Sequence, residues 1–126
     1  GRMGKPMVKA LLAAGYRVQL HDRYPSDVEF FTSLGGEWKD TPREAAQGAD
    51  FVVTNLPLPE HVYEAMTGAD GGLAGMRKGA VWADFSTTDY HNTLRLAALA
   101  EKQGSHALEC PVTNLHQLGV EVCNCA

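Results

Sequence analysis

The apolar residues near the start of the chain recur at the spacing of one helix face. Within residues 5–14, Leu11 lies four positions after Met7 and three after Val8, and Leu12 lies four after Val8. Gly15 follows at a position typical of a helix C-terminus. Capping boxes that begin at Ser26 and Thr41 and a capping Asp89 predict three further helices, and a fourth is expected from Pro59 to Met66. These helices are residues 26–34, 41–48, 59–66 and 90–102.

Short apolar or alternating runs lie between the helices and predict strands. They are residues 17–21, 51–55, 80–84 and 107–109, with a further strand at 120–125. A glycine-rich loop is expected at residues 68–75, with one tight turn around Leu73, and another loop at 111–119. Strands that alternate with helices indicate parallel βαβ units. The predicted fold is α/β, a Rossmann-type doubly wound parallel sheet whose first strand is missing.

Composition narrows the classes of function. The 126 residues are 44% hydrophobic and 21% charged, which is typical of a globular domain. The net charge of −4 and the pI near 5.7 show that the chain lacks the excess of basic residues typical of nucleic-acid-binding proteins. We therefore expect no nucleic-acid partner. No apolar run approaches the length of a bilayer span, so we expect no membrane association. Cys123 and Cys125 are spaced so that both thiols would lie on the same face of a strand, with His116 nearby. Because no second pair of ligands accompanies them, we expect no metal.

The start of the chain has the second half of a dinucleotide-binding fingerprint. Gly1 and Gly4 form a G-x-x-G pattern ahead of the first helix, and Asp22 lies about twenty positions further on. The glycines allow the backbone to approach a pyrophosphate at a helix N-terminus, and the carboxylate can hold an adenosine ribose. Three other segments follow predicted strands and are expected at the same edge of the sheet: residues 21–23, 55–57 and 84–87.

The order of these motifs resembles the 3-hydroxyisobutyrate dehydrogenases of the β-hydroxyacid dehydrogenase family. The similarity extends to about Gly119. The motifs that carry it are Gly1-Arg2-Met3-Gly4-Lys5-Pro6-Met7, Ala14-Gly15-Tyr16, Leu56-Pro57, Gly71-Gly72-Leu73, Asp84-Phe85-Ser86-Thr87-Thr88 and Cys110-Pro111-Val112-Thr113.

The resemblance implies a role for each matching residue. Gly1, Arg2, Met3 and Gly4 would meet the pyrophosphate of the cofactor. Leu56 and Pro57 would lie along the adenosine, and His61 would take a cofactor-side position where relatives have asparagine. Thr87 would lie by the nicotinamide, with Ser86 beside it as a substrate contact. Thr113 would replace the serine that touches the substrate's carboxylate, and Asn114 would follow it in the same loop.

Two departures from the family pattern affect function. The family reads Pro-Val-Ser-Gly-Gly, whereas this chain has Thr113-Asn114-Leu115 in place of the last three residues. The loss of both glycines removes backbone freedom and predicts a reshaped substrate pocket. The family's catalytic lysine lies in a C-terminal helical domain that is absent from this chain. We therefore expect residues 1–126 to be a partial N-terminal dinucleotide-binding domain that is inactive, and does not fold cooperatively, by itself.

The expected cofactor is NAD rather than NADP, because the carboxylate of Asp22 would repel a 2′-phosphate. Arg23 favours NADP instead, since an arginine there can pair with that phosphate. The predicted function is hydride transfer between NAD and a small 3-hydroxy acid. Alternatives are a reductase of imines or of a glyoxylate-type aldehyde, and a non-catalytic dinucleotide-binding module. The partners expected are a small-molecule substrate and, at full length, further copies in a homo-oligomer. The expected compartment is the cytoplasm, with the mitochondrial matrix as an alternative.

Overall fold

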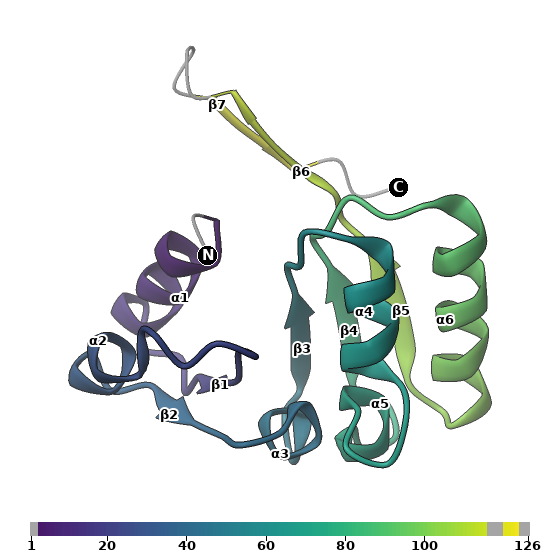
Figure 1. The fold of residues 1–126 in the computed structure, drawn as a ribbon, viewed down its shortest axis with the longest axis horizontal. Coiled ribbons are helices and arrows are strands. Elements are labelled where there is room, and N and C mark those ends of the chain that lie inside the picture. Colours follow the sequence, from purple (N-terminus) through teal and green to yellow (C-terminus); the bar gives the residue numbers. More distant parts are fainter. Residues whose placement is uncertain (1–2, 116–119, 124–126) are drawn as a thin grey trace.

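The computed structural model describes residues 3–115 and 120–123, which form a mixed α/β fold of short elements (Figure 1). In chain order these are α1 (Gly4–Ala13), β1 (Gln19–Leu20), α2 (Val28–Ser33), β2 (Glu37–Trp38), α3 (Pro42–Ala46), β3 (Phe51–Thr54), α4 (Pro59–Met66), α5 (Gly72–Gly75), β4 (Val81–Asp84), α6 (Tyr90–Lys102), β5 (His106–Glu109), β6 (Val112–Leu115) and β7 (Val120–Cys123).

The described strands form three separate sheets. Strands β3, β4 and β5 are parallel neighbours in that order, with Val52 opposite Trp82 and Trp82 opposite Ala107. Strands β1 and β2 form a two-stranded parallel sheet, and β6 pairs with β7 as an antiparallel hairpin. The parallel order and the intervening helices confirm the Rossmann-type class. The two parallel sheets are not hydrogen-bonded to one another, so β1 and β3 are both edge strands.

The core lies on one face of the three-stranded sheet. Trp82 projects from β4 into a buried cluster formed with α4, α5 and α6, which lie on the same side of the sheet in Figure 1. The buried members of this cluster are Val62, Met66, Leu73, Trp82, Leu96 and Ala100. Because strand residues alternate between faces, the in-register row Val53, Ala83 and Leu108 lies on the opposite face. Val53 and Leu108 are 45% and 50% exposed there.

The predicted helix boundaries lie within about two residues of those in the structure, and local capping chemistry fixes several of them. Gly15 adopts φ 88° after α1, a left-handed conformation that glycine accepts without strain. Thr41 accepts a hydrogen bond from the Glu44 amide at 3.1 Å, and Asp89 accepts one from the Asn92 amide at 2.9 Å. These two contacts are the side-chain caps predicted for α3 and α6.

Three details of the sequence prediction were wrong. No capping box begins at Ser26: α2 starts at Val28 after Asp27, whose carboxylate forms an ion pair with Lys5 of α1 at 2.7 Å instead of capping the helix. The two-residue strand β2 was not predicted. Within the expected loop at 68–75, by contrast, the tight turn predicted around Leu73 is confirmed as the short helix α5, where Gly75 allows close approach to the Arg43 carbonyl. The expected loop at 111–119 contains β6, while residues 116–119 lie outside the described part of the chain.

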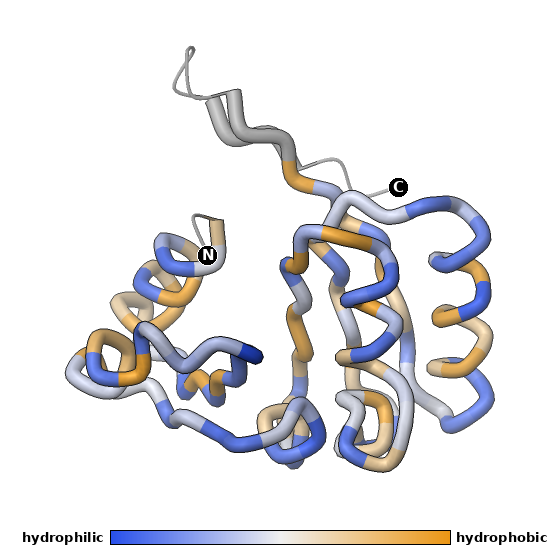
Figure 2. The backbone as a smooth tube through the Cα atoms, viewed as in Figure 1, coloured by the Kyte–Doolittle hydropathy of each residue, from blue (hydrophilic) through white to orange (hydrophobic). Residues whose placement is uncertain are grey.

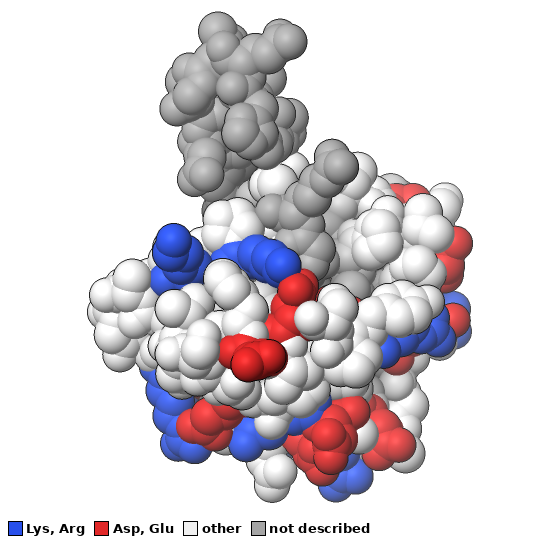
Figure 3. All heavy atoms as spheres, turned by 60° about the vertical axis from the view of Figure 1, so that its left-hand side comes forward, with Lys and Arg blue, Asp and Glu red and all other residues white. Residues whose placement is uncertain are grey.

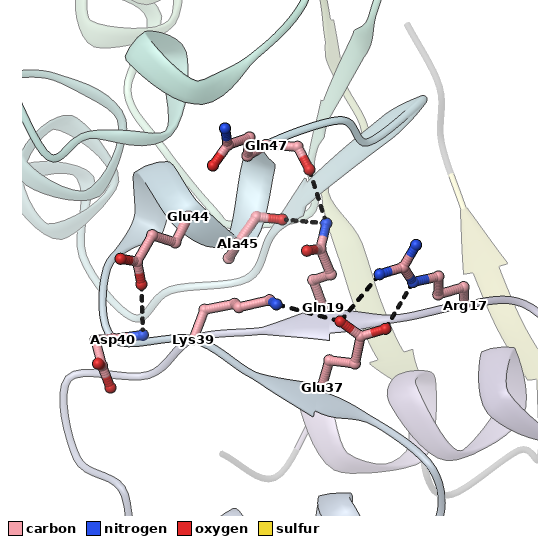
Figure 4. A network of polar contacts seen from close by, with 8 residues as sticks. All are labelled: Arg17, Gln19, Glu37, Lys39, Asp40, Glu44, Ala45 and Gln47. Atoms are coloured by element: carbon pink, nitrogen blue, oxygen red, sulfur yellow. Dashed lines mark hydrogen bonds and ion pairs between the residues drawn. The ribbon is translucent and has the colours of Figure 1, made fainter.

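A polar network holds the small sheet together and connects it to α3 (Figure 4). Arg17 donates from Nε to Oε1 of Glu37 at 2.6 Å, and Lys39 donates to Oε2 of Glu37 at 3.2 Å. Gln19 donates through Nε2 to the carbonyl of Gln47 at 2.9 Å. These side-chain hydrogen bonds therefore help to stabilise a sheet whose strands have only two residues each.

Candidate functional site: the carboxyl edge of the parallel strands

The loops that follow β3 and β4 begin side by side. Thr54 and Asp84 are opposite one another at the ends of these parallel strands, so the segments that continue from them leave the sheet at the same edge. Asn55 at the end of β3 donates through Nδ2 to the sulfur of Met7 at 3.5 Å. This contact places the first turns of α1 beside the same edge, as a dinucleotide site requires.

A buried polar network fixes the two loops relative to each other. Thr54 donates through its hydroxyl to Oδ1 of Asp84 at 2.7 Å and accepts from Nε1 of Trp82 at 2.9 Å. The same Oδ1 accepts the amide of Ser86 at 3.0 Å. The Ser86 hydroxyl in turn accepts the amide of Leu56 at 2.8 Å. Because every link is a hydrogen bond to a buried or half-buried group, the network sets the backbone positions at this edge.

The predicted site residues of these two loops differ in their exposure. Ser86 is 1% exposed and its hydroxyl bonds the Leu56 amide, so in this structure it orients the backbone. Thr87 and Pro57 are exposed, and Leu56 and His61 are half-buried. The hydroxyl of Thr88, the next residue, lies 2.6 Å from that of Thr93 on α6. Thr87 thus presents its side chain to solvent, while its neighbours on both sides are bound to the fold.

The loop after β1 presents charged side chains. Asp22 and Arg23 are both exposed, and Oδ1 of Asp22 accepts the amide of Tyr24 at 3.0 Å. This turn fixes the direction of the carboxylate directly after the strand. Arg23 forms an ion pair with Glu64 of α4, with 3.5 Å between Nη2 and Oε2. The charged loop of the small sheet is thereby connected to the helix that follows β3.

The N-terminus of α1 is suited to an anion. Its first turn contains no acidic residue, and the one basic residue there, Lys5, is held by Asp27. The amides at such a helix end carry partial positive charge. Met3 is the N-cap and Gly4 the first helical residue, whereas Gly1 and Arg2 lie outside the described residues. On the face shown in Figure 3, basic and acidic side chains are interspersed. An anion would therefore be attracted by individual groups on this face and not by an extended basic patch.

Not every recess of the described structure lies at this edge. A groove of about 500 Å³ lies between the C-terminal ends of α4 and α6 and is lined by residues such as Met66, Leu73 and Leu99. It is therefore at the other end of the strands. Thr113 and Asn114 lie in β6, opposite Val122 and Glu121 of β7.

Sequence reasoning identified the exposed residues at the strand ends and the buried Ser86, but it gave no role to Thr54 or Asp84. Thr54 and Asp84 fall within predicted strand segments, where their polar side chains gave the only available signal. A threonine and an aspartate that end two neighbouring strands are candidates for a shared hydrogen bond. Glu64, within the predicted helix 59–66, gave no signal beyond that of a solvated helix face.

Parallel strands that end in clustered loops beside a helix N-terminus define a dinucleotide-binding domain of the Rossmann class. The chain belongs to the family of the NAD-binding domain of 6-phosphogluconate dehydrogenase, whose family model matches residues 1–115.

Similar proteins agree with this membership. The chain is 35% identical to mouse mitochondrial 3-hydroxyisobutyrate dehydrogenase over 113 residues, which are 90% of this chain and 34% of the mouse protein. It is 34% identical, again over 113 residues, to an NAD-dependent L-serine dehydrogenase of Pseudomonas aeruginosa, covering 90% and 38%. The structure of 3-hydroxyisobutyrate dehydrogenase from Mycobacterium tuberculosis with L-serine superposes with a TM-score of 0.82 at 32% identity, covering 90% and 38%. The chain thus spans a little over a third of the length of these relatives.

Among residues 3–115 and 120–123, no helix has the length and apolar character that crossing a bilayer requires.

Proposed function

We propose that this chain binds NAD and forms the dinucleotide-binding part of an oxidoreductase that transfers a hydride between NAD and a small 3-hydroxy acid. The observation that carries the proposal is the convergence of the N-terminus of α1, the Asp22 loop and the loops after β3 and β4. Relatives named for 3-hydroxyisobutyrate and L-serine both act on 3-hydroxy acids, which supports this substrate class.

In this proposal the amides from Gly1 to Gly4 hold the pyrophosphate, and Asp22 accepts hydrogen bonds from the ribose hydroxyls. Leu56, Pro57 and His61 flank the adenosine, with Arg23 nearby, and Thr87 lies by the nicotinamide. The nicotinamide, when bound, supplies the hydride acceptor. Ser86 acts by holding the Leu56 backbone. Thr113 and Asn114 contribute to the cradle for the substrate, and their difference from the family pattern favours a substrate other than 3-hydroxyisobutyrate.

The remaining features of the whole protein are proposals that rest on the family resemblance. A lysine outside this chain would move the hydroxyl proton, so we expect no turnover from residues 1–126 alone. A C-terminal helical domain would contain that lysine and build a homo-oligomer interface. A cytoplasmic location remains a prediction, and the mitochondrial name of the mouse relative supports the alternative compartment.

The Asp22→Asn variant of the complete protein tests cofactor binding at this site. A carboxylate and a 2′-phosphate about 5 Å apart repel each other by roughly 3 kcal/mol per unit charge at an effective dielectric constant near 20. We therefore expect the ratio of kcat/KM for NAD to that for NADP to fall by about tenfold to a hundredfold. Asp70→Asn removes the same charge from an exposed residue between α4 and α5 and should leave the ratio unchanged. An unaltered ratio in Asp22→Asn would contradict the assignment of Asp22. Absence of dinucleotide binding to the wild-type protein would overturn the proposed function.

A further inference from the structure

The ion pair between Arg23 and Glu64 connects the two halves of the candidate site. Arg23 lies in the loop after β1, and Glu64 lies on α4, which follows β3; these two strands belong to separate sheets. In Figure 1 the loop after β1 extends toward β3 and α4. Both side chains are largely exposed, at 67% and 59%, so either can be rearranged by a bound ligand.

The surroundings of Arg23 decide what this residue can do for a cofactor. It is the only lysine or arginine between β1 and α2, and so the one guanidinium or ammonium group of that loop that can pair with a ribose 2′-phosphate. Its neighbour Asp22 is directed by the Tyr24 amide, so the carboxylate and the guanidinium have different partners. With Glu64 at 3.5 Å, the guanidinium is already paired with an anion. A 2′-phosphate would have to displace that carboxylate or accept a second negative charge beside it.

We infer that Glu64 is a specificity-determining residue that favours NAD over NADP by holding Arg23. The inference rests on the proposed binding of a dinucleotide at this edge. NAD has no 2′-phosphate, so it leaves the Arg23–Glu64 pair intact. NADP requires the arginine, and Glu64 both competes for it and repels the phosphate. Asp22 and Glu64 therefore act together: the first rejects the phosphate directly, and the second occupies the cation that would otherwise attract it.

The test compares Glu64→Gln with Glu60→Gln in the complete protein. Glu60 is an exposed carboxylate in the first turn of the same helix and forms no ion pair in the described structure, so its variant controls for net charge. Dissociation constants for NADH and NADPH are measured by titration of the cofactor's fluorescence. Because an exposed ion pair contributes little and is screened by salt, Glu64→Gln should tighten NADPH binding by about threefold to tenfold. NADH binding should stay within about twofold.

A second background shows whether the effect passes through Arg23. In Arg23→Ala, the further change Glu64→Gln should produce a much smaller gain for NADPH, since the arginine that Glu64 restrains is gone. Equal gains in both backgrounds, or equal shifts for NADH and NADPH, would overturn the inference. A Glu60→Gln variant that tightens NADPH binding as much as Glu64→Gln does would also overturn it. A wild-type protein that binds NADH but shows no change of ratio in Glu64→Gln refutes this inference alone, whereas one that binds neither cofactor refutes the proposed function as well.

Discussion

The Ser86 hydroxyl joins the backbone after β4 to the backbone after β3. It accepts the Leu56 amide at 2.8 Å from a position that is 1% exposed. Leu56 and Pro57 form the wall proposed for the adenosine, while Thr87, next to Ser86, is exposed toward the proposed nicotinamide end. One buried hydroxyl therefore sets the spacing between two surfaces that would meet different ends of the same cofactor.

Ser86→Ala should remove the hydrogen bond between the Ser86 hydroxyl and the Leu56 amide while leaving the solvent-exposed surface unchanged. The Leu56 amide would lose its acceptor in a half-buried position, which costs about 1–3 kcal/mol in the free energy of unfolding. Urea unfolding followed by far-UV circular dichroism measures the loss. Ser33→Ala provides the control, because the Ser33 hydroxyl is exposed and bonds only the Phe30 carbonyl of its own helix. Equal stability of the two variants would show that the Ser86 bond has little energetic weight.

At this scale, the sequence indicated where polar groups lie but not which way they point. Asp22 and Thr87 were predicted from their places after strands, and both are exposed at the expected edge. Ser86, predicted as a substrate contact by resemblance, has a hydroxyl whose observed partner is an amide thirty residues away. That partner depends on the register of β3 against β4, which a single sequence does not specify. The substrate role of Ser86 stays a prediction.

Among the elements, the small sheet of β1 and β2 depends on charge. Each strand has two residues, too few for its ladder to hold the pair alone. Hydrogen bonds from Arg17, and then from Lys39, lower the pKa of Glu37 to about 2, from 4.5. The carboxylate is therefore ionised in the folded protein at pH values where it would be protonated in the unfolded chain.

The sign of this shift predicts an acid-sensitive element. Because the folded-state pKa is depressed, the contribution of Glu37 to stability is present above about pH 4.5 and is lost as the pH falls toward 2. The stability difference between wild type and Glu37→Gln should therefore be largest above that range and shrink as the solution is acidified. Urea midpoints at a series of pH values measure it. A difference that stays constant with pH would show that the network contributes through packing rather than charge.

The elements that could be predicted are those with a local signal. Apolar spacing and caps indicated α1, α3, α4 and α6, and the compact runs indicated β3 and β4. The strand β2 has only two residues, and it is a strand because it pairs with the distant β1, where the Glu37 amide donates to the Val18 carbonyl at 2.9 Å. Similarly, β6 was predicted as a loop because its strand character comes from pairing with β7. Long-range pairing is the information that a local pattern lacks.

Across the whole molecule, buried apolar surface is concentrated in the second half of the described chain. The main cluster is built by α4, α5, β4 and α6, with partly buried contacts from β3 and β5. By contrast, α1 has no buried residue, and Phe31 is the one buried residue of α2. The edge strand β3 carries hydrophobic positions (Figure 2), yet Phe51 and Val53 are 68% and 45% exposed. The two halves therefore share little of the burial that makes unfolding cooperative.

We expect residues 1–126 alone to unfold in more than one step, with the β1–β2 half first. The two tryptophans offer a reporter for each half, because Trp38 lies in β2 and Trp82 lies in the main cluster. In Trp38→Phe, the far-UV circular dichroism of the whole chain should begin to fall at a lower urea concentration than that at which the fluorescence of Trp82 changes. The reason is that the cluster around Trp82 stays buried after α1 and β1 have separated from it. A single sharp transition, coincident by both probes, would show that contacts such as Arg23–Glu64 and Met7–Asn55 couple the halves strongly enough to unfold as one unit.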